Sequence, residues 1–183
     1  MKLPNRIPIL ASILTAATVL ALASRAADDL GAQARQTVAN FVNADPGLQT
    51  FIDNSAVYAV FPDVGKGGFI VGGARGKGVL FEKGAITGQT TMTQASIGAQ
   101  AGGQSFAQII FFQNPGAVSD FKGGRFALGA DVSAVAVSQG ASKSAKFSSG
   151  VAVFTMPKSG LMVQASVGGQ KFSFEPLISP TGK

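Results

Sequence analysis

A glycine-rich stretch of the sequence has the composition of a loop that could hold a phosphate group. Residues 65–79, "GKGGFIVGGARGKGV", combine seven glycines with the cations Lys66, Arg75 and Lys77. A Walker-type loop requires Gly-x-x-x-x-Gly-Lys followed by Ser or Thr, and neither lysine has these neighbours. The last glycines show the spacing of the dinucleotide fingerprint in reverse, and no helical pattern follows them. We therefore expect no nucleotide partner.

Two interpretations of this stretch remain. We predict that its glycines form a turn over residues 72–78, between short strands at 69–71 and 79–81. The turn would expose the cations at the strand ends. They are then either ordinary solvated charges or the cationic wall of a backbone nest that receives an anionic headgroup.

The side chains needed for most catalytic and metal chemistry are missing from the sequence. It has no cysteine and no histidine, which excludes disulfides, thiol nucleophiles, cysteine-based zinc sites and imidazole catalysis. The nine acidic residues are scattered and suggest no carboxylate pair. We expect a protein that is not an enzyme, with no cofactor, no metal site and no nucleic-acid partner.

The composition favours a single domain rich in β structure. The chain has 183 residues, of which 46% are apolar and 13% charged, so it can bury one sizeable core. Its 24 glycines weaken helices but suit bulges, tight turns and closely packed strands. We predict a β-rich domain over residues 55–176, followed by a short tail at 177–183.

The first 26 residues resemble a signal peptide. Lys2 and Arg6 precede an apolar run at 7–22, and small residues follow at two candidate cleavage sites. A retained membrane anchor is the alternative, although the run is short for a spanning helix. Cleavage after residue 26 would remove three cations and no anion, lowering the net charge from +6 to +3. We expect a periplasmic or secreted protein, or one peripheral to the membrane.

Two helices are predicted in the segment that follows, residues 27–54. Apolar residues recur at helical spacing over 28–43, with acidic residues in the first turn, where the helix dipole favours them. Asp45 followed by proline indicates an N-cap and the start of a second helix. A third helix is predicted from Asn114 and the proline after it.

Apolar patterns predict strands in the rest of the domain. Residues 56–61 and 107–112 are continuous apolar runs, as expected for strands buried on both faces. Alternation predicts further strands at 94–101, with Ala95 on a dry face and Gln94 on a wet one, and at 126–134. Paired glycines within the strands favour bending. The predicted fold class is α+β, with a curled or barrel-like, mainly antiparallel β-sheet and short covering helices.

Three ordered blocks of the sequence resemble one family. "AVFPDVGKGGFIVGGARGKGVLF", "SIGAQAGGQSFAQIIFF" and "FKGGRFALGADVSAVA" are similar to successive blocks of SYLF domains, from about Asn54 to Gln170. SYLF domains form a lipid-binding family, and some of its eukaryotic members regulate cortical actin. For an exported bacterial chain, the resemblance implies affinity for phospholipid or a membrane surface rather than for actin.

The sequence thus suggests a non-enzymatic protein of the bacterial cell envelope that binds anionic phospholipid or a membrane surface. The candidate binding residues are the cations Lys66, Arg75, Lys77, Lys143, Lys146 and Lys158. One alternative is a structural or protein-interaction envelope protein without a lipid ligand. Another is a small outer-membrane β-barrel, against which a single tyrosine and the absence of tryptophan argue. The sequence names no protein partner.

Overall fold

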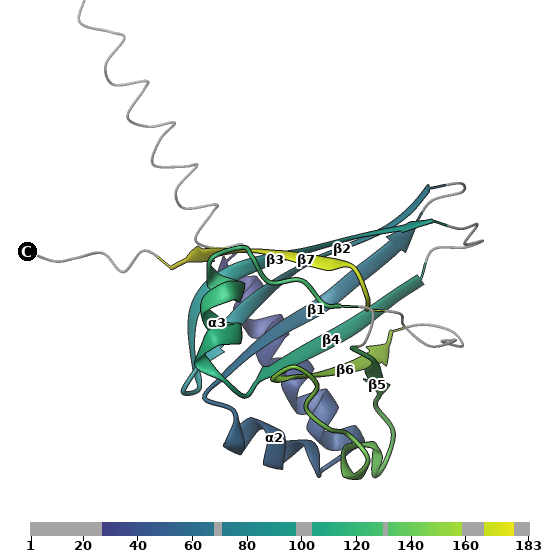
Figure 1. The fold of residues 1–183 in the computed structure, drawn as a ribbon. Coiled ribbons are helices and arrows are strands. Elements are labelled where there is room, and N and C mark those ends of the chain that lie inside the picture. The colour runs from purple at the N-terminus through teal and green to yellow at the C-terminus, as the bar shows by residue number, and fades with distance from the viewer. Residues whose placement is uncertain (1–26, 68–70, 98–103, 130–131, 159–166, 178–183) are drawn as a thin grey trace, which may run out of the picture.

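The computed structural model describes residues 27–67, 71–97, 104–129, 132–158 and 167–177 (Figure 1). The predicted signal peptide, residues 1–26, and all of the tail after residue 177 lie outside these ranges. Among the described residues, no helix has both the length and the apolar character required to cross a membrane.

Seven strands and three α-helices make up the described fold. The elements in chain order are the helix at 27–44, α2 (Leu48–Asn54), β1 (Val57–Gly67), β2 (Val71–Glu82), β3 (Ala85–Ile97), β4 (Gln104–Phe112), α3 (Pro115–Lys122), β5 (Ala134–Ala136), the short 3-10 helix η1 (Ala141–Lys143), β6 (Val151–Pro157) and β7 (Gln170–Pro176). The strands form one sheet in the order β5-β6-β4-β1-β2-β3-β7. All neighbouring strands are antiparallel except β5 and β6. The predicted fold class is therefore confirmed, with an open sheet that has β5 and β7 at its edges.

Both faces of the sheet carry a hydrophobic core. The helix at 27–44 and α2 cover one face, where Phe41 and Leu48 pack with residues of β1, β4 and β6 (Figure 1). On the other face, Phe121 of α3 joins a cluster that includes Phe61 and Phe172. Burial on both sides explains why β1 and β4 appear in the sequence as nearly continuous apolar runs.

Two buried glutamines define how strongly the sheet curls. Gln108 of β4 and Gln170 of β7 exchange amide hydrogen bonds of 2.8 and 3.1 Å, and neither side chain is exposed to solvent. Because β1, β2 and β3 lie between these strands, a flat sheet would separate them by roughly 19 Å. The direct contact requires the sheet to bend around it. We call this side, which α3 covers, the concave face, and the side covered by the helix at 27–44 the convex face.

The glycine-rich segment is a strand, so the predicted turn over residues 72–78 is wrong. β2 runs without interruption from Val71 to Glu82 and pairs with β3 along this whole length. A bulge between Val60 and Val64 of β1 brings that strand's backbone close to β2. A Cβ atom at Gly76 would lie 2.9 Å from the Asp63 carbonyl oxygen and 2.8 Å from the Val64 side chain. Glycine is needed here for close packing and not for turning the chain.

The two faces of β3 are the reverse of what we predicted from residue polarity. Gln94 is buried on the concave face, where its Nε2 donates a 2.9 Å hydrogen bond to the carbonyl of Gly168, and Ala95 is exposed. β3 also begins earlier than predicted, at Ala85, and includes four threonines. Residue polarity gave the wrong face because an amide side chain can be buried in a core when a distant segment of the chain provides its hydrogen-bond partner.

The described part of the strand predicted at 126–134, which lacks residues 130–131, is mostly irregular. Among its described residues only the last belongs to a strand, β5, and upstream a single bridge joins Ala127 to Lys171. Leu128 and Val132 are nevertheless buried in the concave core. The alternation therefore reports correctly which side chains are buried, but it does not identify a hydrogen-bonded partner strand.

Asp45 connects the helical layer to a distant loop. The predicted N-cap role is wrong, because α2 begins at Leu48 with Gly47 in the N-cap position. The Asp45 carboxylate instead accepts the backbone N–H of Gly47 at 3.1 Å and that of Ser142, in η1, at 2.7 Å. Burial opposes ionisation of this carboxyl group, but these hydrogen bonds outweigh it and lower its pKa below the usual value.

We predict that the Gln108→Met substitution destabilises the protein by about 1–3 kcal/mol, because it leaves the buried Gln170 amide without its partner. Urea unfolding followed by circular dichroism measures the change. The double variant Gln108→Met/Gln170→Met replaces both amides with apolar groups of similar length and should recover most of the loss. A double variant as unstable as the sum of the two single variants would contradict this role.

We also predict that the contribution of Asp45 to stability depends on pH. Because folding lowers the Asp45 pKa, the stabilisation is complete above the unfolded value near 4 and declines as the pH falls through the folded value. Wild type should therefore exceed Asp45→Asn in stability at pH 7 by a margin that shrinks towards pH 3. Urea unfolding of both proteins across this range measures the margin. A constant margin would contradict the assignment.

Candidate functional site

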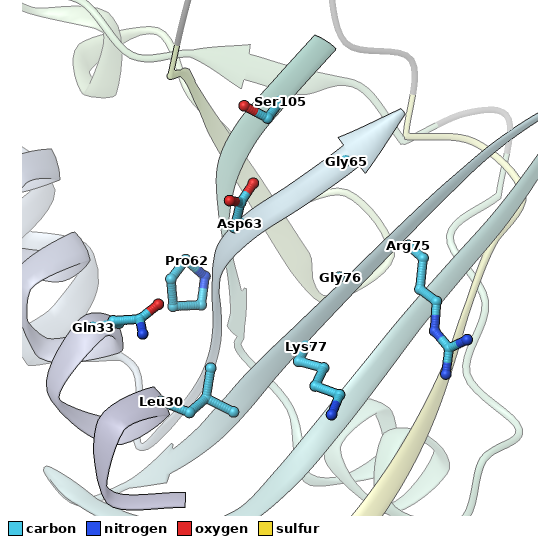
Figure 2. A pocket seen from close by; sticks show the side chains of 9 residues that line it. All are labelled: Leu30, Gln33, Pro62, Asp63, Gly65, Arg75, Gly76, Lys77 and Ser105. Carbon is cyan, nitrogen blue, oxygen red and sulfur yellow. The ribbon is translucent and has the colours of Figure 1, made fainter. Parts of the chain in front are cut away.

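An open groove of about 600 Å³ lies on the convex face beside the N-terminal part of the helix at 27–44 (Figure 2). The helix contributes Leu30 and Gln33 to its lining. β1 contributes Pro62 and Asp63, and β2 contributes Arg75 and Lys77. The groove thus combines two cations, one carboxylate and an apolar edge.

Strand alternation directs the two cations into this groove. On β2, Ala74 and Gly76 are buried towards the concave side, whereas Arg75 and Lys77 are exposed. Val79, two residues further along, is on the same face as Lys77 but is buried beneath the helix at 27–44. The helix therefore covers β2 at Val79 but does not cover the part of the strand that carries Arg75 and Lys77.

The bulge in β1 shapes the opposite wall. Proline within a strand is confined to edges, first positions and bulges, and Pro62 lies where the pairing of β1 with both neighbours shifts register. Beyond the bulge, Asp63 pairs with Lys77 and Gly65 pairs with Arg75. Gly65 leaves the groove open between its walls, because a Cβ atom there would meet nothing within 4 Å.

The charges of the groove differ in how they are paired. Neither Arg75 nor Lys77 forms a salt bridge with another described residue. Asp63 forms a 3.2 Å ion pair with Lys158, whose backbone N–H also bonds to Ser105 at the groove. Within the described ranges, no three acidic side chains come together in a way that could hold a metal ion. The groove can therefore offer two available cations to a ligand.

Lys171 extends the basic surface, and our reading of the sequence did not identify it. It is exposed on β7 and pairs with Thr93 of β3, which in turn pairs with Arg75. Directly opposed residues share a face, so Lys171 and Arg75 lie in one row about 10 Å apart. The pairing of β3 with β7 joins distant segments, and no local pattern could have indicated it.

Of the other predicted cations, Lys158 borders the groove through its ion pair with Asp63, whereas two lie elsewhere. Lys143 and Lys146 are exposed near η1, beyond the far end of the helix at 27–44, where Asp45 holds Ser142. The helical rise puts this end roughly 20 Å from Leu30. Lys66 pairs with Ala74 and Gln104, one register step from Arg75, and its side chain lies outside the described part. Whether any of these cations contacts lipid stays a prediction.

Comparison with known proteins gives the class of this domain. Residues 93–176 match the family model Ysc84, which is described as "Las17-binding protein actin regulator" and represents the SYLF domain. The family predicted from the sequence blocks is therefore confirmed over these residues. The match includes Ser105, Lys158 and Lys171 but begins after β1 and β2, and is thus shorter than the predicted range.

A curated relative extends this finding. Beta cell expansion factor A of Aeromonas veronii is 26% identical over 144 residues, which cover 77% of this chain and 54% of the relative. The chain thus spans about half the length of this relative.

We predict opposite outcomes for two glycine substitutions at the groove. Gly65→Val should leave stability unchanged or raise it by up to about 1 kcal/mol, because the position is open and glycine is unfavourable in a strand. Gly76→Val should cost at least about 1–3 kcal/mol, since its side chain would collide with Val64 and the Asp63 carbonyl. Thermal unfolding compares them. Equal stability of the two variants would mean that the bulge does not pack against β2 as described.

Proposed function

We propose that this chain is a non-enzymatic, phospholipid-binding protein of the bacterial cell envelope. Its groove on the convex face binds lipid phosphate groups through Arg75 and Lys77, and anionic lipids strengthen the interaction. The protein acts at the membrane surface from the periplasm or the exterior, after removal of the signal peptide predicted at residues 1–26.

One observation carries this proposal: Arg75 and Lys77 line the same open groove and have no acidic partner among the described residues. Cations that stabilise a fold are usually paired, whereas unpaired neighbours on one strand repel each other slightly. An anion bound between them would remove that repulsion. Leu30, which is partly exposed at the edge, offers apolar contact next to the charges.

The small free energy contributed by each cation explains why lipid binding needs apolar contact as well as charge. Each cation near an anionic leaflet contributes about 1 kcal/mol, and salt weakens this attraction. Two cations alone therefore give only about 2 kcal/mol, equivalent to a Kd of roughly 30 mM. Apolar contact at the groove edge and further cations in the same row, such as Lys171, add to the binding without requiring deep insertion into the bilayer.

Family membership supports the same chemistry. The resemblance to SYLF domains implies affinity for phospholipid, and a bacterial relative fits an envelope role better than an actin-regulating one. A structural or protein-interaction role without lipid is the competing function, and vesicle binding separates the two.

We predict that Arg75→Gln/Lys77→Gln weakens binding to vesicles of phosphatidylcholine and phosphatidylglycerol about thirtyfold, from the loss of two contributions of about 1 kcal/mol each. Vesicle flotation at low and physiological salt measures binding. Gly65→Val, which narrows the groove without changing charge, should also weaken it.

The matched control is Lys143→Gln/Lys146→Gln, which removes the same net charge at the opposite end of the helix at 27–44. It should bind nearly as well as wild type. If both double variants lose binding equally, net charge and not the groove is responsible. If the wild-type protein does not float with vesicles of any composition, it is not a lipid binder, and the structural role replaces our proposal.

A further inference from the structure

The groove contains one feature that attraction to anionic lipid does not explain. Among the described residues that line it, Asp63 is the single acidic one, and it lies directly opposite Lys77 in the pairing of β1 with β2. A carboxylate at this place repels phosphate. Its side chain is 58% exposed and takes no part in the core. Asp63 is therefore available to a ligand that carries a positive charge beside its phosphate.

The ion pair between Asp63 and Lys158 demonstrates what kind of group the carboxylate accepts. The Lys158 ammonium lies 3.2 Å from Asp63 Oδ2, and its side chain is itself 44% exposed. Exposed pairs of this kind contribute little to stability. A second primary ammonium group can therefore replace that of Lys158 at small cost.

We infer that the groove recognises a phosphoethanolamine headgroup, with the phosphate on Arg75 and Lys77 and the primary ammonium on Asp63. This inference rests on the proposed function and specifies the lipid class. The two charges of this headgroup are joined by a two-carbon linker, and the complementary side chains are on paired positions of adjacent strands. Gly65, which pairs with Arg75 next to Asp63, adds no side chain that would obstruct the headgroup.

Hydrogen bonding makes the site selective among zwitterionic lipids. A primary ammonium has three N–H donors, as in lysine, and can bond directly to the Asp63 carboxylate. The trimethylammonium group of choline has no N–H donor. Phosphatidylethanolamine and phosphatidylcholine have the same net charge, so a preference between them reports on this contact and not on overall attraction.

The test compares vesicles that contain a fixed fraction of phosphatidylglycerol and, as the remainder, either phosphatidylethanolamine or phosphatidylcholine. Wild type should bind the ethanolamine vesicles about two- to fivefold more tightly, as expected for one exposed charged contact. Asp63→Asn should abolish this preference while still binding phosphatidylglycerol. Soluble phosphoethanolamine should displace the wild-type protein from vesicles more effectively than phosphocholine.

Lys158→Gln is the matched control, because it breaks the same ion pair from the other side. It frees Asp63 and should increase the preference for ethanolamine, whereas Asp63→Asn removes it. If the two variants change the preference in the same direction, the ion pair is merely structural and the inference is wrong.

The outcome also separates this inference from the proposed function. Equal binding of wild type to both vesicle types, or equal displacement by both soluble headgroups, overturns the ethanolamine assignment, while loss of phosphatidylglycerol binding in Arg75→Gln/Lys77→Gln keeps the phosphate site. Absence of binding to every vesicle overturns both.

Discussion

The reciprocal hydrogen bonds between Gln108 and Gln170 are the constraint on which the described architecture depends. They join β4 and β7 across three intervening strands within an apolar interior. Each amide is fully buried, so each needs the other to avoid the cost of an unpaired polar group. The paired amides therefore make the observed register of β7 more stable than registers that are shifted by one residue. A slip by one residue would put the charged Lys171 into the concave core in place of Phe172 and would separate the two amides.

The groove follows from the same geometry. Packing the concave core tightly brings the β1 bulge against β2, and β2 tolerates this because Gly76 has no side chain there. The bulge changes the register of β1 and so determines that Asp63 and Gly65 oppose Lys77 and Arg75. The glycines thus have a packing role on one face of β2, while the cations between them form a surface on the other.

Local periodicity predicted the elements whose burial is set by their own sequence. The helix at 27–44, the capped helix α3 and the buried strand β4 agree with their apolar patterns, and the Asn114 side chain accepts the N–H of Ala117 as expected of a cap. The fold class also followed, since alternating apolar runs and paired glycines favour a curled sheet. These features need no knowledge of which segments meet in space.

Prediction failed where tertiary contacts override local preference. Glycine normally marks a turn, but in β2 its missing side chain accommodates a neighbouring strand, which a single segment cannot reveal. Gln94 can be buried because its amide is hydrogen-bonded to a carbonyl group. That carbonyl lies more than seventy residues away, so the local sequence could not indicate it. For the same reason, composition could list the basic residues but could not show that Arg75 and Lys77 share a groove while Lys143 and Lys146 lie elsewhere.

The position of the groove allows its chemistry to change without loss of the fold. The helix at 27–44 buries Val79 and Phe81 of β2, which supply apolar area to the core, and leaves Arg75 and Lys77 beyond its N-terminal end. Removing the charge of these two cations leaves no buried partner unpaired, because they have none among the described residues. Stability resides in the glutamine pair and the two cores, whereas the recognition that we propose depends on exposed side chains at the end of the same strands. Substitutions of Arg75 and Lys77 can therefore change the charge of the groove while the curled sheet remains intact.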